Sequence, residues 1–170
     1  MDEATVQNFV TILGNVLAQD DNIRASATQA FYEFQQSDPN TFAATLFTII
    51  ANQPSSTPRK QACIQAKNFI FKESRKPQSE RSLSSETYQY IITCITQTFG
   101  QMNMDDVEWT ELFLILNRLM IPIILPGLWP EVFTLIWGLL TTNLCYRAIG
   151  FFAEYLSFVK EENLSQIPPE

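Results

Sequence analysis

The chain has 170 residues, of which 46% are hydrophobic, and it carries 18 acidic and 11 basic side chains but no histidine. An apolar fraction of this size supports a packed core and excludes wholesale disorder. The lack of histidine removes the commonest general base and metal ligand, and the pI near 4.6 speaks against nucleic-acid binding, which requires a basic face.

Apolar residues recur with the spacing of amphipathic helices through almost the whole chain. Eight apolar stripes follow one another at residues 6–17, 23–34, 42–50, 62–70, 88–99, 109–120, 132–139 and 145–159. No segment of comparable length alternates with a period of two residues, so we expect no β-sheet. The sequence therefore predicts an all-α fold.

Several residues are typical of helix boundaries. Asp38 and Thr57 each precede a proline, which places a capping side chain before a proline at the first helical position. Asp105 and Glu108 have the spacing of a capping box, with Asp in place of the usual Ser or Thr. Gly100 is placed to end the fifth helix as the residue that follows its C-cap.

The predicted helices form four consecutive pairs. The second helices begin near residues 21, 58, 105 and 143, a spacing of about 40 residues that is typical of HEAT and armadillo arrays. Such pairs stack into a superhelix whose concave face is made by one helix of each pair. We predict an α-solenoid of about four HEAT-type helical hairpins in a right-handed superhelix. It forms a single domain over residues 1–170, with repeats near residues 4–37, 39–76, 83–121 and 129–162. A closed eight-helix bundle is the alternative.

Motifs that carry catalysis or hold cofactors do not stand out in the sequence. The three cysteines, Cys63, Cys94 and Cys145, lie far apart inside apolar helical patterns, which is typical of buried thiols in a reducing compartment. There is no Gly-x-Ser-x-Gly, P-loop or Rossmann glycine pattern. We therefore expect no enzyme, no metal and no organic cofactor. An all-helical bundle that encloses a small ligand is the enzymatic alternative.

The most apolar region, residues 112–146, is not expected to enter a membrane. Its two longest uncharged runs, residues 119–130 and 132–146, are separated by Glu131. Both runs are shorter than the roughly 20 residues that a membrane span needs. We expect buried helices here and a protein of the cytosol or nucleus.

Four segments, in order, are similar to segments of one known protein family. The first is similar to the first inner helix of the family and its exit, and it reads DDNIRASATQAFYEFQQSDPNTF. The second is similar to the second-repeat pattern of Arg, Ala and a Lys-Asn pair, and it reads RKQACIQAKNFI. The last two are similar to the Trp-Pro-Glu that opens the fourth repeat and to the Ala-Ile-Gly helix after it, and they read LWPEVF and RAIGFFAEY. Together the four segments resemble the N-terminal region of the importin-β (karyopherin-β) nuclear transport receptors.

The resemblance implies a partner and a surface. In this family the small GTPase Ran, in its GTP form, docks on the concave face of the N-terminal repeats, whereas cargo and nucleoporins bind largely to later repeats. The resemblance places Lys67 and Asn68 on that face, near the Ran contact. It also implies an acidic inner surface, to which Asp106 and Glu111 are candidates to contribute, and shuttling between cytoplasm and nucleus. An exportin-type member of the superfamily, or a HEAT scaffold unrelated to transport, is the alternative.

Each of these residues also has a purely structural interpretation. Lys67 can be a solvated side chain and Asn68 a brace for the next helical turn. For Asp106 and Glu111, partner contact and ordinary helix capping or solvation are equally open. Asp21, like Asp105, is expected to cap a helix.

Three further expectations concern packing. Arg24 and Arg147 are expected to form internal ion pairs across the solenoid, and all three tryptophans, Trp109, Trp129 and Trp137, are expected in the core. The eighth helix is apolar nearly all round, which is typical of a helix covered on several sides. The terminal repeat of a complete array has a polar outer face, so we expect this chain to be the front of a longer solenoid or a shortened relative of one. Full burial of both Phe151 and Phe158 would contradict that expectation.

Overall fold

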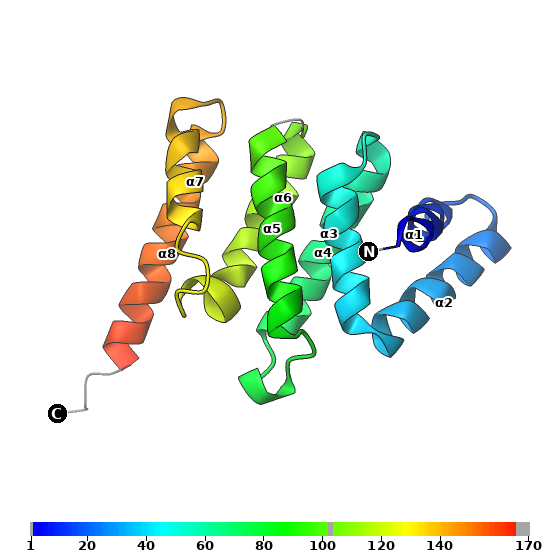
Figure 1. Ribbon diagram of the computed structural model, residues 1–170, viewed down its shortest axis with the longest axis horizontal. Helices are drawn as coiled ribbons and strands as arrows, with labels where there is room; N and C mark the ends of the chain where they lie inside the picture. Colours follow the sequence, from blue (N-terminus) through cyan, green and yellow to red (C-terminus); the bar gives the residue numbers. More distant parts are fainter. Residues whose placement is uncertain (1, 102–103, 166–170) are drawn as a thin grey trace.

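The protein is all-α, as the sequence predicts (Figure 1). The computed structural model describes residues 2–101 and 104–165, with side chains up to residue 160, and these residues contain no strand. The α-helices are α1 (Glu3–Asn15), α2 (Asp21–Ser37), α3 (Pro39–Asn52), α4 (Ser56–Ser74), α5 (Ser85–Gln101), α6 (Asp106–Leu119), α7 (Val132–Gly138) and α8 (Cys145–Ser165). Short 3₁₀ turns span Gln78–Glu80 and Leu139–Thr141, and a π-helical turn spans Met120–Ile124.

The helices follow one another as α1–α2, α3–α4, α5–α6 and α7–α8, which we call the four hairpins, and they stand in a row (Figure 1). The first helices of neighbouring hairpins pack together, α1 on α3 and α3 on α5, and so do the second helices, α4 on α6 and α6 on α8. The α1–α2 hairpin and the α7–α8 hairpin lie at opposite ends of the row. This arrangement differs from a closed eight-helix bundle, in which the end hairpins would meet.

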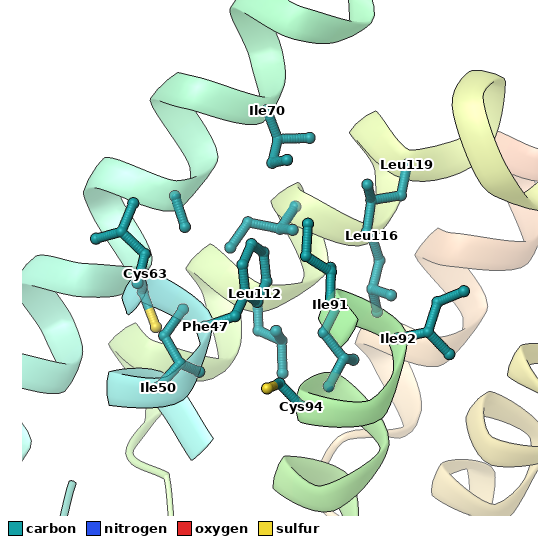
Figure 2. Close-up of a cluster of buried hydrophobic side chains, with 14 of the residues drawn as sticks. Phe47, Ile50, Cys63, Ile70, Ile91, Ile92, Cys94, Leu112, Leu116 and Leu119 are labelled. Carbon is teal, nitrogen blue, oxygen red and sulfur yellow. The ribbon is translucent and has the colours of Figure 1, made fainter. Parts of the chain in front are cut away.

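The middle of the row holds an apolar core shared by two hairpins (Figure 2). Helices α3 and α5 supply Phe47, Ile91 and Cys94 to it, while Cys63 of α4 and Leu116 of α6 meet them from the other layer. All of these side chains are buried, and the thiols of Cys63 and Cys94 are free. The apolar stripes of the sequence therefore identify the core, since residues that recur at helical spacing share one face of each helix.

A cluster of aromatic rings joins the first hairpin to the second. Phe42, at the start of α3, is fully buried. Its ring centroid lies 5.2 Å from those of Phe31 and Phe69, 5.6 Å from that of Phe9 and 5.8 Å from that of Phe34. Edge-to-face pairs of this kind stabilise packing beyond the area that they bury. Phe42 is thus the central contact between the two hairpins.

The helix caps confirm some of the boundary predictions and correct others. Asp38 accepts a hydrogen bond from the Thr41 amide at 3.0 Å, and Asp105 and Glu108 form the expected capping box. The prediction for Thr57 was wrong, because α4 begins at Ser56 and no side chain caps it. Asp20, and not Asp21, caps α2, accepting from the amides of Asn22 and Ile23.

The predicted helix end at Gly100 is also wrong. Helix α5 continues through Gly100 to Gln101. A glycine ends a helix when its backbone takes a positive φ, and among the described residues only Gly127 does so, at 74°. Gly100 keeps helical geometry, so its presence costs some helix propensity without ending the helix.

The fourth hairpin is only partly covered. Trp109 and Trp129 are buried as predicted, but Trp137 of α7 is 68% exposed, so its assignment to the core was wrong. On α8, Phe151 is buried, Phe158 is half-buried, and Leu156 is 64% exposed. The two phenylalanines are therefore not both buried, and the result that would have contradicted a longer solenoid is not observed. Among the described residues, no helix is both long and apolar enough to cross a membrane.

Candidate functional site

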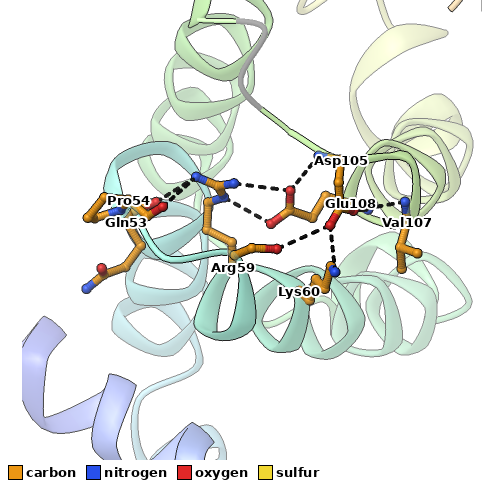
Figure 3. Close-up of polar contacts among 8 residues, drawn as sticks. Gln53, Pro54, Arg59, Lys60, Asp105, Val107 and Glu108 are labelled. Atoms are coloured by element: carbon orange, nitrogen blue, oxygen red, sulfur yellow. Dashed lines mark hydrogen bonds and ion pairs between the residues drawn. The ribbon is translucent and has the colours of Figure 1, made fainter.

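The best-defined polar site lies where α4 meets α6 (Figure 3). The guanidinium of Arg59 donates to both carboxylate oxygens of Glu108, at 3.0 and 3.2 Å, and to the carbonyl oxygen of Gln53 at 2.9 Å. Glu108 is fully buried and also accepts from the amide of Asp105 at 2.7 Å, which completes the capping box. One buried ion pair therefore fixes α4, the α3–α4 turn and the first turn of α6 together.

Asp105 continues this network towards solvent. Its carboxylate pairs with the Lys60 ammonium at 2.6 Å and accepts from the amides of Val107 and Glu108, both at 3.0 Å. The hydrogen bond from Lys60, followed by that from the Glu108 amide, lowers the pKa of Asp105 to about 2. The group is thus held as an anion at the N-terminus of α6, where the helix dipole favours negative charge.

This pKa predicts how the acid stability of the protein depends on Asp105. Its folded pKa of about 2 lies below the ordinary value of 3.8, so its contribution to stability is fully present above about pH 4 and is lost as the pH falls towards 2. We expect Asp105→Asn to destabilise the protein at neutral pH, with the difference from the natural protein shrinking towards pH 2. Urea unfolding at several pH values measures this difference. A difference that stays constant with pH would contradict the prediction, and Glu154→Gln on exposed α8 is the control.

The structure brings together three of the four candidate partner-binding residues. The Lys67 ammonium lies 2.7 Å from a carboxylate oxygen of Glu111, as an ion pair without hydrogen-bond geometry, between α4 and α6. Both side chains are partly buried, with 28% and 16% exposure, and Asn68 is exposed beside them. Asp106 lies apart from this group, because Arg147 of α8 holds it at 2.5 Å.

The two acidic candidates pair with cations of neighbouring helices, and neither caps a helix. Arg147 also donates to the Thr110 hydroxyl at 2.6 Å, so it joins α8 to α6. The internal ion pair predicted for Arg147 is therefore confirmed. The prediction for Arg24 was wrong, because Arg24 pairs with Asp21 within the first turn of α2 and not with another helix. The charged side chains predicted to bind a partner therefore form ion pairs that link the second helices of successive hairpins.

A second group of side chains, around Phe71, lies near Lys67 and Asn68 and is not predicted by the sequence motifs. We call the exposed surface over α2, α4, α6 and α8 the second-helix face. On it, the ring of Phe71 lies beneath two guanidinium groups, that of Arg75 at 4.1 Å and that of Arg118 at 4.6 Å from the ring centroid. The only signal in the sequence is the spacing of four residues between Phe71 and Arg75, which places both side chains on one side of α4. The approach of Arg118 depends on the packing of α6 against α4.

The described side chains of Cys63, Cys94 and the acidic residues show no thiolate and no metal group. Burial raises the pKa of the Cys63 thiol to about 12 and that of Cys94 to about 11, so neither is a thiolate near neutral pH. Within residues 2–101 and 104–160, no three Cys, Asp or Glu side chains are placed to hold a metal ion. The second-helix face carries both paired charges and an aromatic ring with two guanidinium groups over it.

Comparison with known proteins adds no relative from which a function could be transferred. No protein-family model matches the chain, and no curated protein sequence is significantly similar to it. The likeness to importin-β receptors therefore rests on the four sequence segments alone.

Proposed function

We propose that the chain is a protein-docking module, a HEAT-type α-solenoid that forms the N-terminal, Ran-GTP-binding part of an importin-β-like transport receptor. The observation that carries the proposal is the group of Lys67, Asn68 and Glu111, which lies on two adjacent second helices. The row of four hairpins, with first and second helices in separate layers, supports the solenoid. Such a receptor works in both cytoplasm and nucleus, and it uses further repeats for cargo and nucleoporins.

The charge pattern of this group suits a partner of mixed charge. Lys67 and Glu111 present one charge of each sign at a partly buried position, and Asn68 can both donate and accept hydrogen bonds. A protein partner can satisfy both signs at once, whereas a polyanion is repelled by Glu111 and by the net charge of −7. Four hairpins offer enough surface for a standard interface of about 800 Å² per partner.

Titration of the purified chain with Ran loaded with GTP or with GDP tests the proposal. We expect tighter binding of the GTP form, and we expect the double variant Lys67→Ala with Asn68→Ala to weaken it by about 1–3 kcal/mol, because central, desolvated polar contacts dominate such interfaces. Isothermal calorimetry measures both quantities.

Two controls separate binding from folding. Lys160→Ala removes a charge from the exposed end of α8 and should leave the affinity for Ran unchanged. Glu111→Gln removes the partner of Lys67 without truncating the lysine, and thermal unfolding shows whether each variant is folded. Equal affinity for the two nucleotide states, or no binding at high micromolar Ran, would leave a HEAT scaffold unrelated to transport.

A further inference from the structure

Three cations of the second-helix face, Lys72, Arg75 and Arg118, differ from the others in their ion pairing. Lys60, Lys67 and Arg147 each lie within 2.7 Å of a carboxylate oxygen. Among the side chains that the structure describes, the ion pairs include none of Lys72, Arg75 and Arg118, and all three side chains are exposed. The chain has more acidic than basic residues, so carboxylates are not scarce. A local positive charge therefore persists on an acidic protein.

The Phe71 ring holds two of these cations in place. Its centroid lies 4.1 Å from the guanidinium carbon of Arg75, on the same helix, and 4.6 Å from that of Arg118, on α6. A guanidinium over an aromatic face is attracted by the ring quadrupole and is fixed in orientation. Arginine side chains that are ordered before binding lose less conformational entropy when a ligand arrives.

An open cleft with an apolar floor adjoins the ring. It has a volume of about 240 Å³ and is lined by Lys67, Asn68, Phe71, Leu114 and Arg118. Leu114 is 38% exposed, which leaves an aliphatic surface beside the Arg118 guanidinium. A second cleft of about 180 Å³ lies towards α2, and Asn68 and Phe71 form the ridge between the two.

We propose that the Phe71 cleft, defined by Phe71, Leu114, Arg75 and Arg118, docks an acidic segment of a partner protein. Carboxylates of the segment pair with the two guanidinium forks, whose planar donors match a carboxylate in two-point hydrogen bonding. An aliphatic side chain of the same segment enters the cleft and covers Leu114 and the edge of Phe71. The apolar floor favours a peptide that carries both kinds of side chain over an ion that carries charge alone.

The extent of the positive charge argues against a nucleic acid or a lipid surface. Both present long arrays of phosphates and bind through many cations spread along a track. Here two guanidinium groups lie over one ring, and Glu111, close to Lys67 of the same cleft, repels a phosphate array. A short acidic segment is matched in length to this patch. The inference does not depend on Ran, because it rests on Phe71, Arg75 and Arg118, although Lys67 and Asn68 line the same cleft.

The test uses the full chain and a short fluorescein-labelled peptide in which glutamates flank one leucine. We expect saturable binding by fluorescence anisotropy that weakens as salt is added, since exposed ion pairs are screened. A peptide with glutamine in place of every glutamate should lose most of the affinity, and one with serine in place of leucine should lose part of it. Equal binding of the glutamate and glutamine peptides would overturn the proposal.

Variants of the cleft locate the binding. Arg75→Gln and Arg118→Gln should each weaken the glutamate peptide roughly three- to tenfold, as expected for one charge-assisted contact at a partly exposed site. Phe71→Leu should weaken it as well, because the guanidinium groups lose their platform while the helix keeps an apolar side chain. The matched control, Lys160→Gln, removes the same charge at a distant exposed position on α8 and should change the affinity less than about twofold.

Further measurements keep the result unambiguous. Circular dichroism and thermal unfolding show which variants are folded, and only folded variants are compared. Equal loss with Lys160→Gln, or no loss with either arginine variant, would overturn the cleft as the site. Binding of heparin or of phosphatidylserine vesicles that depends on the same arginines and exceeds peptide binding would identify a polyanion site instead. Titrations of Arg75→Gln and Arg118→Gln with Ran distinguish this inference from the proposed transport function. The two variants should lose affinity for the glutamate peptide whether or not their affinity for Ran changes.

Discussion

Replacing Glu108 with glutamine should lower the free energy of unfolding by about 3–5 kcal/mol, the usual cost of leaving one partner of a buried ion pair without its counter-charge. Glu108 is fully buried, and Arg59, which it holds at 3.0 and 3.2 Å, is nearly so. The substitution also weakens the capping box, because an amide accepts from the Asp105 backbone less strongly than a carboxylate does. Urea unfolding followed by circular dichroism measures the loss.

Two further variants show whether the cost comes from the unpaired charge. The double variant Arg59→Met with Glu108→Leu removes both charges and fills similar space, so it should recover much of the stability lost by Glu108→Gln. Glu154→Gln, an exposed change of the same chemistry on α8, should have little effect. A loss below about 1 kcal/mol for Glu108→Gln would show that the pair contributes little and that α6 is held by its apolar contacts.

Replacing Phe42 with alanine should cost about 3–5 kcal/mol, the range for truncating a buried phenylalanine, and its effect should be unevenly distributed along the chain. The ring is fully buried among Phe9, Phe31, Phe34 and Phe69. Hairpins in a row depend mainly on their nearest neighbours. We therefore expect amide hydrogen exchange to rise first in α1 and α2, before α5 and α6 are affected.

Phe42→Leu is the matched control, since it keeps an apolar side chain and leaves a smaller cavity. It should cost less than Phe42→Ala and should change exchange in α1 and α2 to a smaller degree. A uniform increase of exchange along all helices would contradict the prediction and would indicate that the four hairpins unfold as one cooperative unit.

Much of the fold can be predicted from the sequence because helical spacing is a local property. The apolar stripes identify the eight helices, and Asp105 with Glu108 forms a capping box that involves only one turn of chain. Spacing does not tell how much of an apolar face is covered. Trp137 lies in an apolar stripe but on a helix of only seven residues at the edge of the row, and it is exposed.

The candidate site is harder to predict because its contacts join different hairpins. Arg59 and Glu108 are 49 residues apart, and their pairing depends on the register between α4 and α6. The same holds for Lys67 and Glu111, whose types can be singled out in the sequence but whose contact cannot. Arg118 carries no motif, and only the packing of α6 against α4 brings it over Phe71. A single sequence specifies helix faces well, whereas it does not specify which side chains meet across them.

Neighbouring helices are linked by different kinds of contact in the layer of second helices and in the layer of first helices. Ion pairs link the second helices, from Lys60 to Asp105, from Lys67 to Glu111 and from Arg147 to Asp106, whereas neutral hydrogen bonds such as that of Thr48 with Tyr90 accompany apolar packing between α3 and α5. Dissolved ions screen partly exposed charges but hardly affect buried apolar contacts. Added salt should therefore weaken the contacts between the second helices more than those between the first helices.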